Sequence, residues 1–293
     1  MLRIDSLTKI HPGGVAALTD VSLEIGRGMF GLLGPNGAGK STLMKILTGL
    51  LAPSSGSVHL DDVDIAARPE FVREKLGYLP QEFGLYPHLT GRQMLQFFLD
   101  LKGISGRDVA EALLAEVNLL AVADRKVGTY SGGMRQRLGL AQAMAGEPRL
   151  VVVDEPTAGL DPQERQRVYR LLSELGKKST VLLSTHLVED VAVLCPRFAV
   201  LRQGRVVRVT SPGEARGALA GCIYEGRIHE AELETAGERF TVTQAFLVEG
   251  AMHVRLFAQG GEAPEPRFQS VPPTLEDAFV LMMNDATDAT RAA

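Results

Sequence analysis

A glycine-rich segment that ends in lysine, serine and threonine constrains this chain more than any other feature of its sequence. Residues 34–42 read Gly-Pro-Asn-Gly-Ala-Gly-Lys-Ser-Thr and follow a short apolar run at 29–33. They match the pattern G-x-x-x-x-G-K-[ST], which binds phosphate groups where a buried strand turns into a helix. The pattern therefore predicts an α/β fold in which this loop joins a strand at 29–33 to a helix at 42–51.

The residue types in this segment explain how it would hold phosphate. Gly37 and Gly39 permit the tight backbone turn that aims successive N–H groups at phosphate oxygens. Lys40 supplies a cation for the β- and γ-phosphates, and the hydroxyl of Ser41 can ligate Mg²⁺. The residues that we expect to bind the nucleotide here are Gly34, Pro35, Asn36, Gly37, Ala38, Gly39, Lys40, Ser41 and Thr42.

A second apolar run, at 150–153, ends in the two carboxylates Asp154 and Glu155. Asp154 can hold Mg²⁺ through water, and Glu155 can act as the general base on an attacking water. Alone they could equally be solvated acids at a strand end, but beside a phosphate loop they indicate nucleotide hydrolysis. The sequence has no NKxD segment of the kind that recognises guanine, which favours ATP as the nucleotide.

Strand-like and helix-like segments alternate along most of the chain. A further apolar run at 180–183 stops at polar residues, as a buried parallel strand does. Residues 90–146 show apolar side chains at helical spacing, among them Met94, Leu95 and Leu99. This order predicts a parallel sheet with helical cover and an inserted helical subdomain at about 83–146.

Composition narrows the class of protein. Hydrophobic residues make up 45% and charged residues 23% of the 293 residues, which excludes a disordered or collagen-like chain. The longest apolar run, 278–283, is far shorter than a membrane-spanning helix of roughly 20 residues. The first residues, 1–5, contain no apolar segment of a signal peptide. The two cysteines have no metal-binding spacing and fit a reducing cytoplasm. A net charge of −4 without a basic stretch disfavours nucleic acid as the main ligand.

The charge changes sign along the chain. The first 216 residues are net positive and the rest net negative, and a turn-type sequence, Ser211-Pro212-Gly213, precedes the change. We therefore predict domains at 1–215 and 216–293. In the second domain, residues 240–248 and 252–256 alternate like half-buried strands, and a three-residue loop at 249–251 would keep their apolar faces together. These features predict a small acidic C-terminal domain that is α/β or β-rich.

Further segments resemble the motifs of one family, the ABC ATPases. Residues 131–136, Ser-Gly-Gly-Met-Arg-Gln, are similar to the LSGGQ signature, and Gln81 is similar to the glutamine of the Q-loop. Residues 158–161, Ala-Gly-Leu-Asp, resemble the D-loop, and residues 184–186, Ser-Thr-His, resemble the H-switch. The match covers about 1–215 in the family's order. It departs at Tyr130 and Met134, where the family usually has Leu and Gln.

The resemblance implies a P-loop, RecA-like core and an ATP site shared by two subunits that meet head to tail. Each ATP would lie between the phosphate loop of one subunit and Ser131, Gly132 and Gly133 of the other. Asp161 would link the two sites. Gln81 would contact Mg²⁺ and the attacking water. His186 would contact the γ-phosphate, unless it only caps a strand. His11 stands where the family stacks an aromatic ring on adenine, although an exposed loop histidine explains it equally well.

The same resemblance implies an ATPase subunit that powers membrane transport through a separate integral-membrane permease. We expect a second ATP-binding subunit, most simply an identical copy, and a location in the cytoplasm on the inner face of the cell membrane. Residues 272–279, Pro-Pro-Thr-Leu-Glu-Asp-Ala-Phe, resemble the ending of subunits paired with ABC-2 type exporter permeases, including those of drug and antibiotic resistance, which favours export. Thr274 could also be a plain helix cap.

Two other functional classes stay open. Soluble ABC ATPases that act on ribosomes or DNA usually carry two cassettes or a long coiled coil, whereas this sequence shows one cassette and no heptad arm. A regulatory protein that binds ATP without transport is disfavoured because Glu155 and His186 are intact.

The segment 81–87 joins the predicted core to the helical subdomain and carries three large apolar side chains, Phe83, Leu85 and Tyr86. Turn-forming residues among them predict a surface loop. The apolar side chains would either pack on the helical subdomain or meet a partner. The family resemblance favours contact with the permease.

Overall fold

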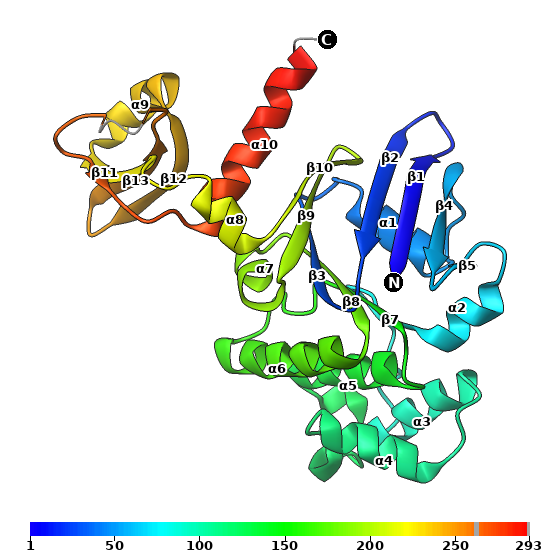
Figure 1. Cartoon of the computed structure of the whole chain (residues 1–293). Helices are drawn as coiled ribbons and strands as arrows, with labels where there is room; N and C mark the ends of the chain where they lie inside the picture. Colours follow the sequence, from blue (N-terminus) through cyan, green and yellow to red (C-terminus); the bar gives the residue numbers. More distant parts are fainter. Residues whose placement is uncertain (261–263, 292–293) are drawn as a thin grey trace. The chain divides into compact units, whose positions relative to one another are not determined.

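The chain folds into two compact units in the computed structural model, which describes residues 1–260 and 264–291 (Figure 1). The first unit consists of Met1–His186 with Leu201–Val206, and the second of Leu187–Val200 with the chain from Val207 onward. Strands β9 (Arg197–Arg202) and β10 (Arg205–Thr210) contribute to both units. These bounds differ from the predicted domains 1–215 and 216–293, since some segments before residue 216 belong to the second unit.

Four parallel strands form the centre of the first unit in the order β3-β8-β7-β6. They are β3 (Gly28–Leu33), β6 (Leu76–Leu79), β7 (Leu150–Asp154) and β8 (Thr180–Thr185). Helices α1 (Lys40–Leu47) and α6 (Pro162–Lys178) pack against this sheet. β7 and β8 are buried along their whole length, as parallel strands covered on both faces are. The predicted α/β class and its three predicted strands are confirmed, and the carboxyl ends of the four strands lie at one edge.

An antiparallel sheet in the order β2-β1-β4-β5 completes the core of this unit, and the sequence did not predict it. Its strands are β1 (Leu2–Ile10), β2 (Ala16–Ile25), β4 (Ser55–Leu60) and β5 (Val63–Asp64), and α2 (Pro69–Lys75) follows them. The pairing of β1 with β2 shifts register after Ile4, and Ser6 has a positive φ of 45°. Such irregularities interrupt the alternation of apolar and polar residues by which strands are recognised.

The predicted helical insertion is confirmed. It contains α3 (Gly91–Leu101), α4 (Arg107–Glu116) and α5 (Gly132–Met144), with 3₁₀ turns η1 (Leu120–Val122) and η2 (Val127–Thr129) between the last two. Thr90 caps α3 in a reciprocal capping box with Gln93. Met94, Leu95 and Leu99 lie in one apolar core with the buried side chains of α4 and α5, so this part of the first unit has a core of its own.

The second unit is built on an antiparallel sheet in the order β12-β13-β11-β14, which confirms a β-rich C-terminal region. Its strands are β11 (Ile223–Ile228), β12 (Thr241–Val248), β13 (Ala251–Phe257) and β14 (Gln269–Ser270). Its helices are α7 (Val188–Leu194), α8 (Pro212–Gly217), α9 (Leu233–Arg239), α10 (Leu275–Arg291) and the 3₁₀ turn η3 (Glu230–Glu232). None of the helices described in either unit is long and apolar enough to cross a membrane.

The connection between β12 and β13 shows that the predicted three-residue loop is wrong. Val248 pairs with Ala251, so the turn consists of Glu249 and Gly250 alone. Both residues have positive φ, 50° and 80°, as a type I′ turn requires. The apolar faces come into phase farther along, at a bulge around Thr243, which adds one residue to β12.

Asp277 fixes the start of α10 to the sheet of the second unit. Its carboxylate is fully buried and accepts hydrogen bonds from Arg255 Nη2 at 2.8 Å and from Thr243 Oγ1 at 2.5 Å. The backbone N–H of Thr274 donates to it at 2.8 Å, and Arg255 also donates to the carbonyl oxygen of Pro272 at 2.9 Å. The Pro-Thr-Leu-Glu-Asp segment is therefore a helix cap joined to a buried ion pair, and its resemblance to exporter subunits stays a prediction.

Candidate functional site at the carboxyl edge of the sheet

The glycine-rich loop follows β3 and spans residues 34–39, and α1 begins at Lys40, two residues earlier than predicted. Gly37 and Gly39 have positive φ angles of 79° and 107°, which other residues rarely adopt. A Cβ atom at Gly39 would lie 2.6 Å from the carbonyl oxygen of Ala17. The loop can therefore form its tight turn only with glycine at this position.

The loop exposes part of its backbone and one hydroxyl at the start of the helix. Pro35, Asn36 and Gly37 are exposed, whereas Gly34 and Ala38 are buried beneath them. Ser41 is exposed in the first turn of α1, and Thr42 is half-buried. Backbone N–H groups in the first turn of a helix have no intrahelical acceptor, so this end of α1 favours an anion.

Lys40 is the first residue of α1 and is buried. Its Nζ donates hydrogen bonds to the carbonyl oxygens of Gly34 at 2.5 Å and Pro35 at 3.1 Å. Burial lowers the pKa of Lys40, while the nearby Glu155 and Asp154 favour its charged form. Carbonyl oxygens hold the ammonium less strongly than an anion does, so phosphate oxygens can replace them.

Asp154 ends β7 opposite Ser184 of β8, and both are buried. Burial raises the pKa of Asp154, and Glu155 adds to the rise, while Ser184 and Lys40 offset part of it. The Ser184 hydroxyl faces this carboxylate without reaching hydrogen-bond geometry, and it has no other partner among the residues that the structure describes. The Ser184 hydroxyl therefore leaves polar capacity unused beside the buried carboxylate of Asp154, although buried polar atoms are normally paired.

Glu155 and His186 contact each other directly. The Glu155 carboxylate lies 2.7 Å from Nδ1 of His186, which stands one residue beyond the end of β8. Glu155 is buried and has a positive φ of 50°, a conformation that costs energy for a residue with a side chain. In this conformation the carboxylate of Glu155 contacts His186, whose side chain is itself exposed. Such a carboxylate can orient the imidazole or take a proton from a water beside it.

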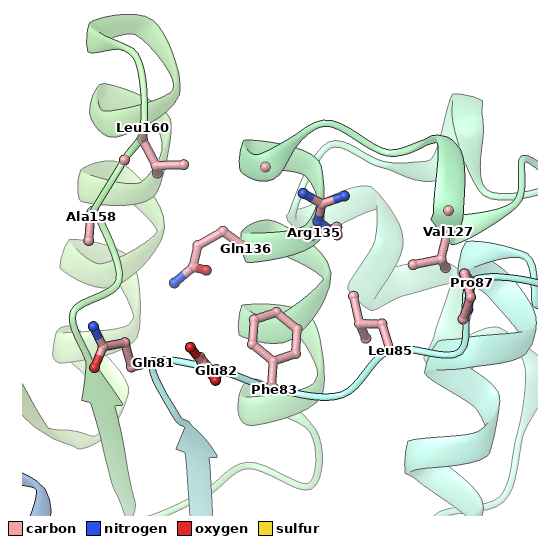
Figure 2. Close-up of a pocket in the computed structure, with 13 residues that line it drawn as sticks. Gln81, Glu82, Phe83, Leu85, Pro87, Val127, Arg135, Gln136, Ala158 and Leu160 are labelled. Atoms are coloured by element: carbon pink, nitrogen blue, oxygen red, sulfur yellow. The ribbon is translucent and has the colours of Figure 1, made fainter.

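Gln81 follows β6 and lines a cavity of about 470 Å³ within the first unit. Figure 2 shows Gln81 beside the lower end of the segment with Ala158 and Leu160, while Gln136 of α5 points toward this segment from the opposite side. Gly132, at the start of α5, and Gly159 also line this cavity. The cavity therefore joins three of the predicted motifs, which are the glutamine, the signature and the D-loop.

The signature segment begins α5, and Ser131 is the N-cap, since its Oγ accepts a hydrogen bond from the Met134 N–H at 3.2 Å. Gly132 is exposed, with nothing within 4 Å of the position that a Cβ would take. The departure at Tyr130 is accommodated in the helical core, where the ring is buried and its hydroxyl donates to the carbonyl oxygen of Val122 at 2.9 Å. Tyrosine at this position therefore leaves the start of α5 free for a ligand.

Two predicted residues lie outside these groups. Asp161 is the N-cap of α6 and accepts a hydrogen bond from the Glu164 N–H at 2.9 Å. His11 is half-buried in the turn between β1 and β2, where its N–H donates to the carbonyl oxygen of Val15 at 2.9 Å. The described contacts place neither side chain on Lys40, Asp154 or Glu155, and the stacking role of His11 stays a prediction.

The arrangement has the donor set that Mg²⁺ takes together with a nucleotide. No group of three or more acidic, histidine or cysteine side chains among the described residues could hold a metal by itself. Mg²⁺ is usually held by one or two protein oxygens, water and substrate phosphates. Asp154, the unpartnered hydroxyl of Ser184 and the exposed Ser41 hydroxyl fit that use. Ser184 was named only as part of the Ser-Thr-His segment, because its place directly opposite Asp154 appears only in the pairing of β7 with β8.

Comparison with known proteins agrees with this geometry. The family model described as ABC transporter matches residues 18–158. Nod factor export ATP-binding protein I of Bradyrhizobium diazoefficiens is 35% identical over 288 residues, covering 92% of each protein. ABC transporter A family member 3 of Arabidopsis thaliana is 36% identical over an alignment of 228 residues that covers 74% of this chain. The chain spans only 24% of the length of that relative.

Solved structures give the same family. A dimeric ATP-binding cassette in a post-hydrolysis state, bound to ADP and phosphate, matches with a TM-score of 0.65 and 29% identity over 72% of this chain and 98% of that one. The ATP-binding subunit of an ABC transporter matches with a TM-score of 0.67 and 30% identity over 74% of this chain and 92% of that one. A phosphate loop, a carboxylate edge and a signature helix on this fold, together with relatives along most of its length, show that the chain belongs to the ABC transporter family and carries its ATP-binding ATPase domain.

Proposed function

We propose that this protein binds and hydrolyses ATP with Mg²⁺ and thereby powers export through a separate permease. The observation that carries the proposal is the cluster at the carboxyl edge of the sheet, where Lys40 stands near Asp154 and Glu155, and Glu155 contacts His186. These are a cation for phosphate, a carboxylate for the metal, and a carboxylate–histidine pair for water.

Each side chain has one task in this proposal. Lys40 leaves the carbonyl oxygens of Gly34 and Pro35 and neutralises the β- and γ-phosphates. Glu155 takes a proton from the attacking water, because its buried carboxylate lies at the end of the strand beside the loop. His186, oriented by Glu155 through the 2.7 Å contact, holds the γ-phosphate.

Mg²⁺, when bound, neutralises charge that develops on the phosphates. Ser41 would hold it directly, Asp154 through water, and Gln81 from the loop after β6. Gln81 lies in the segment that joins the core to the helical insertion. Binding of Mg²⁺ by this residue would therefore change the cavity that it lines.

We propose that two copies of the chain bind ATP between them. The exposed Gly132 and the capping Ser131 leave the start of α5 open, and the positive end of that helix favours an anion. Ser131, Gly132 and Gly133 would bind the γ-phosphate held by the partner's phosphate loop. Asp161 would lie beside the shared interface. The dimeric cassette that matches this chain supports the arrangement.

The loop at 83–87 is our candidate contact with the permease. Two of its large apolar side chains pack inside the first unit, and the third is exposed. The Phe83 ring lies against Gly139 of α5, where an added Cβ would be 2.6 Å from it, and Leu85 packs on the helical core. Tyr86 is 49% exposed and meets the ring of Phe97 edge to face at 5.6 Å. We therefore assign partner contact to Tyr86 and packing to Phe83 and Leu85.

Export is proposed because the relative that matches along 92% of this chain is named as an export ATP-binding protein. The protein would then lie on the inner face of the cell membrane, held there by the permease. Co-purification from detergent-solubilised membranes tests this. A polytopic membrane protein recovered in stoichiometric amount supports it, whereas recovery of ribosomes or DNA instead would contradict it.

A further inference from the structure

A buried ion pair joins the helix of the signature segment to the helix of the D-loop. Arg137 of α5 is 5% exposed, and its Nε lies 3.1 Å from Oε2 of Glu164 in α6. The side chain of Glu164 is also largely buried, at 13% exposed. Two opposite charges that are removed from water in this way fix the relative position of the helices that carry them.

Both partners are tied at once to the segments that would bind nucleotide. Glu164 is three residues after Asp161, and its N–H donates to Asp161 Oδ1 at 2.9 Å. A Cβ atom added to Gly133 would lie 2.6 Å from both Cγ and Oε2 of Glu164. The Glu164 carboxylate therefore packs directly against the second glycine of the signature, while its backbone N–H donates to the capping carboxylate of Asp161 in the D-loop.

Arg137 also connects α5 to α4, another helix of the helical subdomain. Its Nη1 donates to the carbonyl oxygens of Val117 and Asn118, each at 2.9 Å, at the end of α4. Arg137 lies one helical turn after Gly133 on α5, so its guanidinium connects α5 to the end of α4 and, through Glu164, to α6. Figure 2 shows the segment with Ala158 and Leu160 on one side of the cavity and α5 with Arg135 and Gln136 on the other.

We propose that the Arg137–Glu164 pair is a positioning device that makes the signature and the D-loop of one subunit move as one body. This rests on the proposed function, in which both segments face the partner's ATP. When the loop at Gln81 shifts the helical subdomain, the pair carries the shift from α5 to Asp161. Both residues act on hydrolysis through Gly133 and Asp161 and touch no reacting atom.

The test combines ATP turnover with dimer formation in the full chain. We would replace Glu164 by Gln, Arg137 by Met, and both together as Arg137→Met with Glu164→Leu. Apolar replacement of a whole buried pair often preserves stability, so the double variant keeps the test valid if the single variants unfold. Arg167→Gln is the matched control, because Arg167 pairs with the same carboxylate from the surface of α6.

We expect the double variant to lose about 10- to 100-fold in kcat, the scale of a small misplacement in an active site. ATP-driven dimerisation should weaken, while nucleotide affinity of the monomer and Tm stay near wild type. Arg167→Gln should keep kcat within about twofold, as surface substitutions do. A double variant with wild-type kcat and dimerisation would overturn the proposal. A wild-type chain that never hydrolyses ATP would instead overturn the proposed function, and the dimerisation assay would still test the pair.

Discussion

Two buried aspartates of this chain have opposite surroundings. Asp277 in the second unit accepts hydrogen bonds from Arg255, Thr243 and Thr274, which lower its pKa although burial alone would raise it. Asp154 in the first unit is about equally hidden, but burial prevails there and raises its pKa. At Asp277 the hydrogen-bond partners outweigh the cost of burial, whereas at Asp154 the cost of burial outweighs the partners.

This difference separates a structural site from a binding site. A buried charge with all its partners holds a fold together, as Asp277 holds α10 to the sheet. A buried charge without them is unfavourable unless a ligand supplies the missing partner. The buried Asp154 and the unpartnered hydroxyl of Ser184 lie together at the carboxyl edge of the sheet, which is where ligands bind in open α/β folds.

Among the variants considered for the two sites, Glu155→Gln should have the largest effect. The amide cannot accept a proton from water, so kcat should fall roughly 10²- to 10⁴-fold. ATP binding should survive, since Lys40 and the loop are unchanged. Lys40→Ala is the contrasting variant and should lose affinity for ATP itself. Steady-state hydrolysis and equilibrium binding of ATP measure both, and wild-type turnover by Glu155→Gln would remove Glu155 from its role.

On the other side of the comparison, Asp277→Ala should destabilise the second unit by about 3–5 kcal/mol, because it leaves Arg255 buried without its carboxylate. Hydrogen exchange of the β12 and β13 amides measures this in the full chain. Amides of β7 and β8 should exchange as in the wild type. Glu276→Ala, at the exposed neighbouring position, is the control. Equal exchange in the two variants would show that the pair is not what holds α10.

The same pair predicts a dependence on pH. The pKa of Asp277 in the folded protein lies below its ordinary value of 3.8. Its contribution to stability is therefore complete above that value and is lost as the pH falls through the folded pKa. Asp277→Asn should be less stable than wild type at pH 7, and the difference should shrink as the pH is lowered below about 3.8. A difference that grows on acidification would mean that the sign is wrong.

A smaller effect of opposite sign is expected at Asp154. Asp154→Asn removes a charge whose burial outweighs its favourable interactions with Ser184 and Lys40, so the protein without nucleotide should gain on the order of 1 kcal/mol. Hydrolysis should fall at the same time, because the amide is a poor ligand for Mg²⁺. Thermal unfolding without ATP, followed by an activity assay, tests both. A lower Tm in this variant would show that Asp154 is a structural residue like Asp277.

The smallest effect concerns the loop at 83–87. Phe83→Ala should cost about 1–2 kcal/mol, because its half-buried ring packs on Gly139. Tyr86→Ala should change stability by less than about 0.5 kcal/mol and weaken permease binding. Thermal unfolding and co-purification of the permease distinguish the two. Equal losses of stability would place Tyr86 in the core.

Three of the four central parallel strands and the phosphate loop could be predicted from sequence because each rests on local patterns, whereas β6 was not predicted. Residues 29–33 and 150–153 are continuous apolar runs, and glycine at position 39 is required by the approach of Ala17. The antiparallel sheet of the first unit was missed since register shifts in β1 break its alternation. The predicted three-residue loop between β12 and β13 is wrong because the bulge near Thr243, and not the turn, brings the apolar faces of the two strands together.

Contacts between distant segments were beyond the reach of sequence patterns. Nothing local links Arg137 to Glu164, or Arg255 to Asp277, since each pair forms only after separate helices and strands have packed. The contact between Glu155 and His186 was not predicted either, because the family resemblance gave each residue only its own role toward the nucleotide and the attacking water. Its geometry depends on the positive φ of Glu155, which the sequence does not indicate.

The mass of Glu155→Gln in solution, with and without MgATP, tests the central claim most directly. We expect a monomer without nucleotide and a dimer with two bound ATP molecules when MgATP is present, measured by light scattering together with nucleotide analysis. Adding Ser131→Ala or Lys40→Ala should abolish the dimer. A Glu155→Gln protein that binds ATP and stays monomeric, or that forms its dimer equally well without ATP, would contradict the account.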